Sequence, residues 1–385
     1  MFAKKTIFVL AAISVLFLYA CGPKAMAPRA ELDTPEHHVT IGNKLLKAGK
    51  IDDAYREFNR AKELNPKFSP AYVGLGLVDG FRDNFKAGLK TMKEARKYAR
   101  GDEQKIAVNV GFMRLYIMGK ENVDKNWLKL VEKEFNKAML IAKDVSEPYF
   151  YMGLAYKMSY KFRQAVDQFS RVLELDKGYI AEADKEYALV QKIERAMPGS
   201  KIGKKIALVE EITRADVAAL FIEELKVDEL FIKRTPKKFD TAFKSPGKEF
   251  EAGKYVKTPP ATDIDDHVLK ADIDAVIAIG IKGLQPFPDH TYKPYKLITR
   301  AEFAMMIEDI LIKITGVDEL ATRFIGSVSP FPDLRNDLPY FNAVIICTTR
   351  GIMVAKDLAT GEFAPMDTVS GADSLLSIRA LKLQL

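Results

Sequence analysis

The sequence predicts an all-α fold with two folded parts, an array of helical hairpins over residues 35 to 180 and a three-copy helical bundle over residues 181 to 385. The first part repeats small and large apolar residues at helical spacing, with a period of about 34 residues. The second part contains, three times, a hydroxyl residue followed three positions later by an acid at the start of a predicted helix. That arrangement caps a helix, because the two side chains satisfy backbone amides at its N terminus.

The first 20 residues have the layout of a secretory signal peptide. Lys4 and Lys5 precede an apolar run from Ile7 to Leu18. This run is shorter than the about 20 apolar residues that a membrane-spanning helix needs, so we expect it to export the chain and then to be removed. Residues 21 to 34 follow with two prolines and few large apolar residues, which indicates a tether ahead of the first folded part.

A cysteine stands at the end of this leader. The residues from Leu18 to Gly22 resemble the lipobox of bacterial lipoproteins, in which a small residue precedes the cysteine. The resemblance implies lipidation of Cys21, and several acyl chains on one cysteine hold a protein stably at a bilayer. An ordinary signal peptide with a chance cysteine is the alternative. Gly22 after the cysteine implies sorting to the outer membrane, facing the periplasm, as in diderm bacteria.

The cysteine content indicates whether disulfides can form, and the net charge indicates which anionic partners suit the chain. Cys347 is the only cysteine besides Cys21 and lies in an apolar stretch, so a buried thiol and no intrachain disulfide are expected. The formal net charge is +7, with acidic and basic residues interspersed. A solvated surface explains this balance most simply, and wall polymer or lipid headgroups are better anionic partners than nucleic acid for an exported chain.

Four units follow the tether. In the first, over residues 35 to 68, the characteristic positions hold small or large apolar residues, namely Gly42, Ala54, Phe58 and Ala61, and the unit ends at Pro66. Further units are centred near Gly76, Gly111 and Gly153, the third being stretched by several residues. These patterns resemble the tetratricopeptide repeat family, which implies hairpins that stack into a curved array with a concave groove.

The resemblance also identifies residues that face the groove. They are Asn43, Val73, Leu77, Phe81, Phe150, Leu154 and Met158. In some relatives a set of basic and amide residues clamps a peptide carboxylate, and only Asn43 of that set is present here. The resemblance therefore implies an apolar segment of an exported protein, or the neighbouring domain, as the occupant of the groove. Aromatic and apolar residues at such spacings are otherwise core residues.

Three short motifs mark the second part, each beginning with the capping hydroxyl. They are Thr213-Arg214-Ala215-Asp216, Thr299-Arg300-Ala301-Glu302 and Ser370-Gly371-Ala372-Asp373. The second and third copies also share an upstream Ala-Val-Ile sequence, at Ala275 and Ala343, and Phe331-Pro-Asp333 opens the third. These residues resemble the S-layer homology repeat, which implies a pseudo-threefold helical bundle with copies near residues 181–226, 262–314 and 329–382.

In that family the grooves between copies bind anionic wall glycan or peptidoglycan-associated polymer. The resemblance implies a site made of motif and turn residues, namely Arg214, Arg300, Thr213, Thr299, Glu302 and Asp289. Guanidinium groups suit carboxylate ligands, and helix N termini add amide donors. Gly371 replaces the arginine in the third copy, so one pocket is expected to be lost. The alternative is a structural bundle in which each arginine bonds a neighbouring loop.

Catalytic and metal sites are not indicated by the sequence. The run from Gly199 to Lys205 lacks the first glycine and the hydroxyl residue of a phosphate loop. Asp263 to His267 begins like a calcium loop, but Val268 stands where glycine must allow a bend. Four histidines in all, of which His37 and His38 lack further ligands at a recognised spacing, leave little for metal binding or general base catalysis. No cofactor is expected.

Taken together, these features predict a non-catalytic lipoprotein of the cell envelope. It would act as a scaffold or tether that holds wall polymer in its second part and a protein partner in the groove of its first. The alternative is a periplasmic assembly factor, or an accessory subunit of an envelope enzyme, whose array binds exported proteins while the bundle is purely structural.

Overall fold

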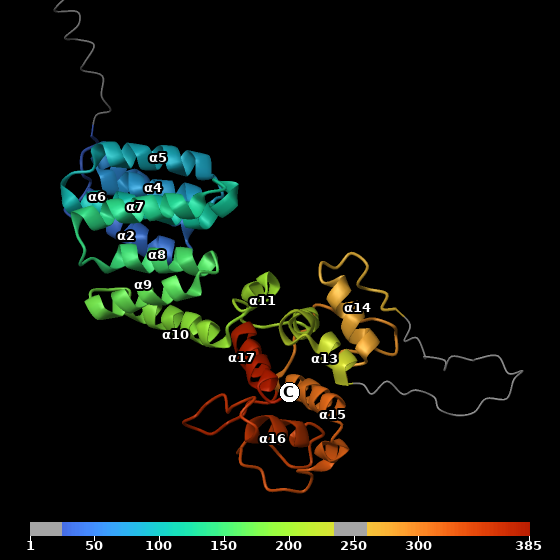
Figure 1. Cartoon of the computed structure of the whole chain (residues 1–385). Coiled ribbons are helices and arrows are strands. Elements are labelled where there is room, and N and C mark those ends of the chain that lie inside the picture. Colours follow the sequence, from blue (N-terminus) through green and yellow to red (C-terminus); the bar gives the residue numbers. More distant parts are fainter. Residues whose placement is uncertain (1–24, 235–259) are drawn as a thin grey trace, which may run out of the picture. The chain divides into compact units, whose positions relative to one another are not determined.

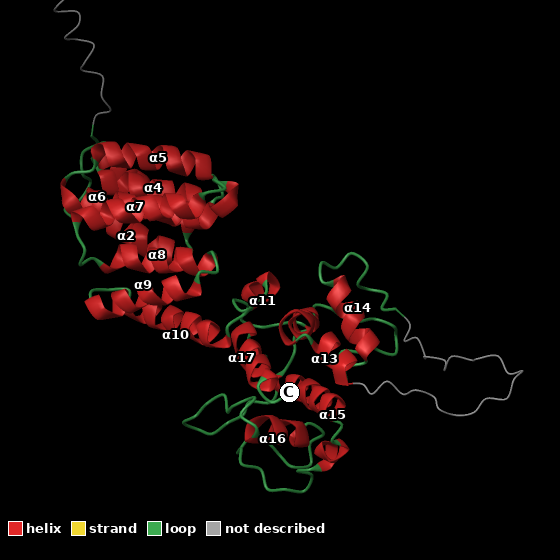
Figure 2. Cartoon of the chain, viewed as in Figure 1, coloured by secondary structure: helices red, strands yellow, loops and turns green. Residues whose placement is uncertain are grey.

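A computed structural model describes residues 25–234 and 260–385 of the chain (Figure 1). The predicted signal peptide and Cys21 lie outside the described residues. The described part is helical (Figure 2). Its β structure is limited to two isolated bridges, which confirms the all-α prediction. None of its helices is long and apolar enough to cross a membrane. The chain divides into two compact units after Tyr187, and each is described separately.

The first unit is a series of antiparallel helical hairpins. Its helices are α2 (Pro35–Lys47), α3 (Ile51–Leu64), α4 (Ser69–Phe81), α5 (Phe85–Tyr98), α6 (Gly101–Gly119), the 3-10 turn η1 (Lys120–Asn122), α7 (Trp127–Ile141), α8 (Ser146–Met158), α9 (Phe162–Leu175) and the first part of α10 (Ile180–Ala196). Consecutive helices pair, and the first helices of neighbouring hairpins also contact one another. The division between the units falls inside α10, whereas the sequence boundary was predicted at its start.

Close helix crossing within the hairpins depends on glycine. A Cβ atom built on Gly42 would lie 2.6 Å from Cε1 of Phe58, and one built on Gly153 would lie 2.6 Å from Cε1 of Phe169. Both phenylalanine rings are fully buried, so each ring occupies the space that a side chain at the glycine would need. The close approach that the sequence pattern predicts at Gly42 is confirmed.

The described part of the predicted tether is bound to the array. The Met26 amide donates to the Glu63 carbonyl at 2.8 Å, and Arg60 donates to both Asp33 carboxylate oxygens, at 2.5 and 3.1 Å. His38 lies between the carboxylates of Asp33, at 2.8 Å, and Glu57, at 2.6 Å. The tether predicted over residues 21–34 is therefore bound to α3 from residue 26 onward, because a backbone hydrogen bond and partly buried ionic contacts hold this segment there.

The His38 contacts make the stability of the array depend on pH. Burial lowers the pKa of His38, but the hydrogen bonds to Glu57 and Asp33 outweigh it and raise the pKa above the ordinary value. The stabilisation is therefore complete below about pH 6.5, where the histidine of the unfolded chain is also protonated, and is lost as pH rises through the folded pKa. We expect the urea midpoint of the array to fall over that rise.

Fluorescence of Trp127 reports this transition, because Trp127 is the single tryptophan and is buried in the first unit. His38→Gln should lower the midpoint at acidic pH and remove most of its decline as the pH rises through the folded pKa. His37→Gln, on the same helix, serves as the control and should retain the decline. An equal decline in the parent protein and in His38→Gln would show that another group is responsible.

The second unit is a bundle of shorter helices. They are α11 (Lys201–Ile206), α12 (Arg214–Leu220), the π-helical turn η2 (Phe221–Leu225), α13 (Val227–Arg234), α14 (Lys270–Ile279), α15 (Arg300–Thr315), the 3-10 turn η3 (Asp318–Thr322), α16 (Phe341–Thr349) and α17 (Gly371–Lys382). The three motifs open α12, α15 and α17, where Thr213, Thr299 and Ser370 accept hydrogen bonds from amides three residues on. The predicted helix caps are confirmed.

Three backbone hydrogen bonds join the segments ahead of these helices into a closed ring. Ile212 donates to the Val369 carbonyl, Val369 to that of Ile298, and Ile298 to that of Ile212, each at 3.1 Å. Every segment donates once and accepts once. The three chain segments are therefore equivalent in their hydrogen bonds. This is the arrangement expected of a pseudo-threefold bundle.

The third motif departs from the other two because it lacks space for a side chain. A Cβ atom built on Gly371 would lie 1.7 Å from the carbonyl oxygen of Ile206, and the Gly371 amide donates to the Val209 carbonyl at 2.9 Å. Real Cβ atoms do not approach backbone atoms so closely. The absence of arginine at this position therefore has a steric cause.

Candidate functional site: a groove in the helical array

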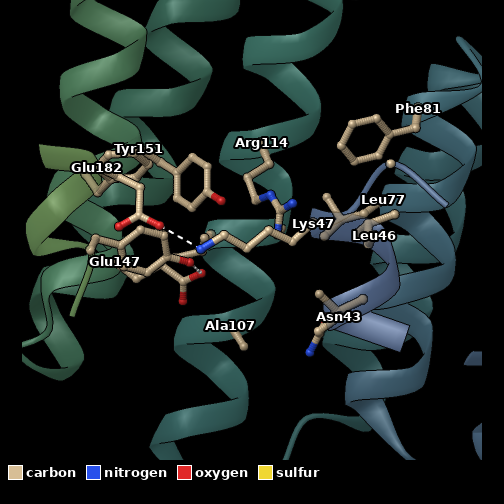
Figure 3. Close-up of a pocket in the computed structure, with 16 residues that line it drawn as sticks. Asn43, Leu46, Lys47, Leu77, Phe81, Ala107, Arg114, Glu147, Tyr151 and Glu182 are labelled. Atoms are coloured by element: carbon tan, nitrogen blue, oxygen red, sulfur yellow. Dashed lines mark hydrogen bonds and ion pairs between the residues drawn. The ribbon is translucent and has the colours of Figure 1, made fainter. Parts of the chain in front are cut away.

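A concave groove lies along the first helices of the hairpins in the first unit. It encloses a cavity of about 700 Å³ and is lined by residues of α2, α4, α6 and α8 and by Tyr179 and Glu182 (Figure 3). Five of the predicted groove residues line it, namely Asn43, Val73, Leu77, Phe81 and Phe150. A cavity of this size accommodates several side chains of a bound segment.

Two predicted groove residues do not line the cavity. On α8 the lining residues are Glu147, Phe150 and Tyr151, whereas Leu154 and Met158 lie one and two turns further along the helix. Met158 instead packs against the apolar cluster around Trp127. The assignment of Leu154 and Met158 to the groove is therefore wrong for this cavity, because the groove ends near the middle of α8.

The floor of the groove comes from α6, where the sequence analysis assigned no groove residue. Ala107, Val110, Gly111 and Arg114 line it, and their spacing places them on one face of the helix. The side chain of Met92 fills the space beside Gly111, where an added Cβ would lie 2.6 Å from Cε of Met92, and Arg114 ends the stripe. The spacing around Gly111 could have identified this face, but the irregular length of the third unit obscured the register.

One wall of the groove is apolar. Val73, Leu77 and Phe81 follow one another at intervals of four residues along α4 and therefore share a face. Leu77 is buried in the core, whereas the Phe81 side chain is 46% exposed at the end of the row. An exposed aromatic ring beside a concave apolar wall is typical of a contact for a bound partner.

The opposite wall is aromatic. The rings of Phe150 and Tyr179 stack with centroids 4.8 Å apart, and Tyr151 contacts Tyr179 edge-on at 6.0 Å. The Tyr179 hydroxyl donates to Glu147 at 2.7 Å. Burial and the adjacent Glu147 carboxylate raise the pKa of Tyr179 well above its usual range, so the phenol remains a hydrogen-bond donor and this wall is fixed in position.

An ion pair spans the groove between its first and last helices. Nζ of Lys47 on α2 lies 2.6 Å from Oε1 of Glu182 on α10, and the pair is drawn as a dashed line in Figure 3. The hydrogen bond to Glu182 raises the pKa of Lys47, and the same bond lowers the pKa of Glu182. The side chains are 79% and 40% exposed, so solvent screens the pair and it contributes little to stability.

In the second unit, the two motif arginines are buried and bonded to neighbouring loops. Arg214 is 4% exposed and donates to the backbone carbonyls of Tyr292, at 2.8 Å, Gln285, at 3.0 Å, and Gly283. Its guanidinium carbon lies 4.8 Å from the ring centroid of Phe287 and 4.7 Å from that of Tyr292. Its hydrogen-bonding capacity is thus directed to the protein itself.

Arg300 repeats this arrangement in the next copy. It is 7% exposed and donates to the carbonyl of Phe363 at 2.8 Å and to that of Val354 at 2.6 Å. Each loop that receives an arginine is also held by an aspartate. Asp263 accepts from the amides of Tyr292 and Lys293, and Asp333 from those of Phe363 and Ala364, at 2.6 to 2.9 Å. Asp263, where a calcium-like sequence begins, therefore has a loop-holding role.

The other predicted wall-polymer residues also bond within the protein. Glu302 closes the cap with Thr299 and pairs with Lys296 at 2.5 Å, while Thr213 caps α12. Asp289 accepts from the amide and hydroxyl of Thr291, at 3.0 and 2.6 Å. Arg214 and Glu302 line one cavity, whereas Arg300 lines a different one, so the six residues are brought together only in part. These contacts favour the structural alternative for the bundle, in which each arginine holds a neighbouring loop.

Two smaller cavities lie in the second unit beside these arginines. One of about 300 Å³ adjoins Arg214 and is also lined by Lys282, Lys296 and Phe287. Another of about 350 Å³ adjoins Arg300 and Asp373. Within the part of the chain that the structure describes, no group of three or more histidine, cysteine, aspartate or glutamate side chains could hold a metal ion. Burial raises the pKa of the Cys347 thiol well above its usual range.

Comparison of the chain with protein-family models and with curated proteins gave no match.

Proposed function

We propose that this protein is a non-catalytic adaptor of the cell envelope that binds a segment of another exported protein in the groove of its helical array. The observation that carries the proposal is the gathering of five predicted groove residues around one cavity of about 700 Å³. Rows of apolar side chains on first helices, with space between them, are suited to a segment whose side chains point into the groove.

In this proposal, the residues at the amino terminus determine where in the cell the protein is held. Lipidation of Cys21 would hold the protein at a membrane after the leader has exported the chain, and Gly22 favours the outer membrane. The binding of residues 26 to 34 to α3 supports a short reach, because only the residues between Cys21 and Met26 would then separate the lipid from the array. Five steps of an extended chain span at most about 18 Å.

The second unit has a structural role in this proposal, as in an assembly factor or an accessory subunit. Its two motif arginines donate hydrogen bonds to backbone carbonyls of the loops between copies. The residues that were expected to bind wall polymer therefore stabilise the bundle. Binding of anionic polymer is the second candidate function, and Lys282 in the cavity beside Arg214 favours it, whereas Lys296 in that cavity is paired with Glu302.

Phe81→Ser tests the groove directly. The probe is a set of short peptides selected from a displayed random library on the full chain in detergent. Removing a half-exposed aromatic contact should weaken binding of the selected peptides about tenfold, since burying such a ring contributes about 1.5 kcal/mol or more. Binding is measured by fluorescence anisotropy.

Leu140→Ser is the matched control, because Leu140 is also an exposed apolar residue of the array but does not line the groove. It should leave the affinity unchanged. Equal losses in the two variants, or none in Phe81→Ser, would place peptide binding elsewhere and contradict the proposed function.

A further inference from the structure

Arg114 and Lys47 are two cations that line the groove. Lys47 pairs with a carboxylate, whereas Arg114 has no carboxylate partner among the described residues. Its side chain points into the groove (Figure 3), with the guanidinium carbon 5.2 Å from the ring centroid of Tyr151. Among the described residues that cation–π contact is accompanied by no hydrogen bond or ion pair of Arg114, whose charge also acts on the neighbouring Tyr179. By contrast, Arg60 and Arg96 in the same unit each pair with a carboxylate.

The carboxylates near Arg114 already have partners. Glu182 pairs with Lys47 at 2.6 Å, and Glu147 accepts the hydroxyl hydrogen of Tyr179 at 2.7 Å. The guanidinium therefore presents donors to the groove that no acceptor of the described residues occupies. A planar guanidinium binds a carboxylate through two parallel hydrogen bonds, and contact with an aromatic face holds its plane in position.

We propose that the groove selects a segment in which an acidic side chain is flanked by large apolar residues, with Arg114 binding the carboxylate and the row Val73, Leu77 and Phe81 receiving an apolar neighbour. This inference rests on the proposed function. It makes Arg114 the specificity-determining residue of the groove. Ala107 and Val110 on the same face of α6 contribute small and apolar side chains to the floor beside Arg114.

Geometry, more than net charge, favours a carboxylate at Arg114, because the two cations Arg114 and Lys47 and the two carboxylates Glu147 and Glu182 balance one another. A planar carboxylate can pair with the guanidinium through two parallel hydrogen bonds, whereas a cationic side chain would be repelled by Arg114. The exposed Lys47–Glu182 pair can open at small cost, so Lys47 is available as a second cation beside the ligand.

The test is a double-mutant cycle between Arg114 and the acid of the bound peptide. The probes are synthetic peptides from the selected set that contain Asp or Glu, each made with a free and with an amidated C terminus so that a terminal carboxylate is distinguished from an internal acid. Each is also made with the acid replaced by its amide. Arg114→Gln in the full chain should weaken binding of the acidic peptide about tenfold to a hundredfold, as loss of a charge-assisted contact does.

The amide form of the peptide should bind the parent chain with a similar loss, and combining both changes should add little, because they remove the same contact. Arg114→Lys should recover part of the affinity, and Arg163→Gln, an exposed arginine of α9 outside the groove, should have no effect. Added salt should weaken binding to the parent chain more than to Arg114→Gln.

The outcomes separate this inference from the proposed function. If Phe81→Ser weakens binding while Arg114→Gln does not, the groove binds a segment but the carboxylate assignment is overturned. If only peptides with a free C terminus show the Arg114 effect, the carboxylate is the terminal one and an internal acid is excluded. If neither variant alters binding, or no peptide is recovered from the library, the proposed function itself fails.

Discussion

Arg214→Gln is expected to destabilise the second unit by about 3 kcal/mol or more. The arginine donates to three backbone carbonyls and lies between two aromatic rings at 4% exposure. Glutamine is too short to reach all three acceptors, and each buried carbonyl left without a donor costs about 1 to 3 kcal/mol. Calorimetry of the full chain should show the affected transition melting earlier, while the transition reported by Trp127 in the array is unchanged.

Arg335→Gln provides the control, since Arg335 is exposed and its pair with Asp337 is screened by solvent. It should melt with the parent protein. A sacculus-binding assay below the melting point then separates the two roles of Arg214. Retained binding with lowered stability supports the structural role, whereas unchanged stability with lost binding would restore Arg214 to a polymer site.

Gly371→Ala is expected to have an effect at least as large. The added Cβ would lie 1.7 Å from the Ile206 carbonyl oxygen, so the backbone at the junction of α11 and α17 must move. That movement would strain the Gly371–Val209 hydrogen bond that belongs to this contact. Overpacking of this kind costs about 1 to 3 kcal/mol or more, and Gly371→Arg should exceed it.

Gly199→Ala is the matched control, because a Cβ there would meet only Oε2 of Glu224, at an ordinary 3.8 Å. The two variants are compared by thermal unfolding of the full chain. A normal melting temperature for Gly371→Arg would contradict the steric explanation and would mean that an arginine could complete the third motif after all.

Elements with local sequence signals were predicted correctly. Gly42 and Phe58 form the predicted close crossing, because a missing side chain and a large ring must compensate each other within one hairpin. Thr213 and Thr299 cap their helices, because the hydroxyl, the acid and the amides that they bond lie within one helical turn. Such contacts depend on residues close in sequence, so the pattern alone identifies them.

Contacts between distant residues could not be predicted in the same way. The sequence identifies Arg214 as a guanidinium at a helix start, but its acceptors are backbone carbonyls about 70 to 80 positions away, which no side-chain pattern marks. The docking of Met26 on α3 has the same character. In the groove, Arg114 was missed because the irregular third unit hid its register.

We propose that the groove of the array is the surface that binds a partner. Photo-crosslinking tests it most directly: a selected peptide carrying a photoreactive side chain is activated on the full chain, and the labelled residues are identified by mass spectrometry. We expect labels on α2, α4, α6 and α8, including residues next to Phe81 and Arg114. Labels concentrated on α3, α5, α7 and α9, or within residues 260–385, would contradict the proposal.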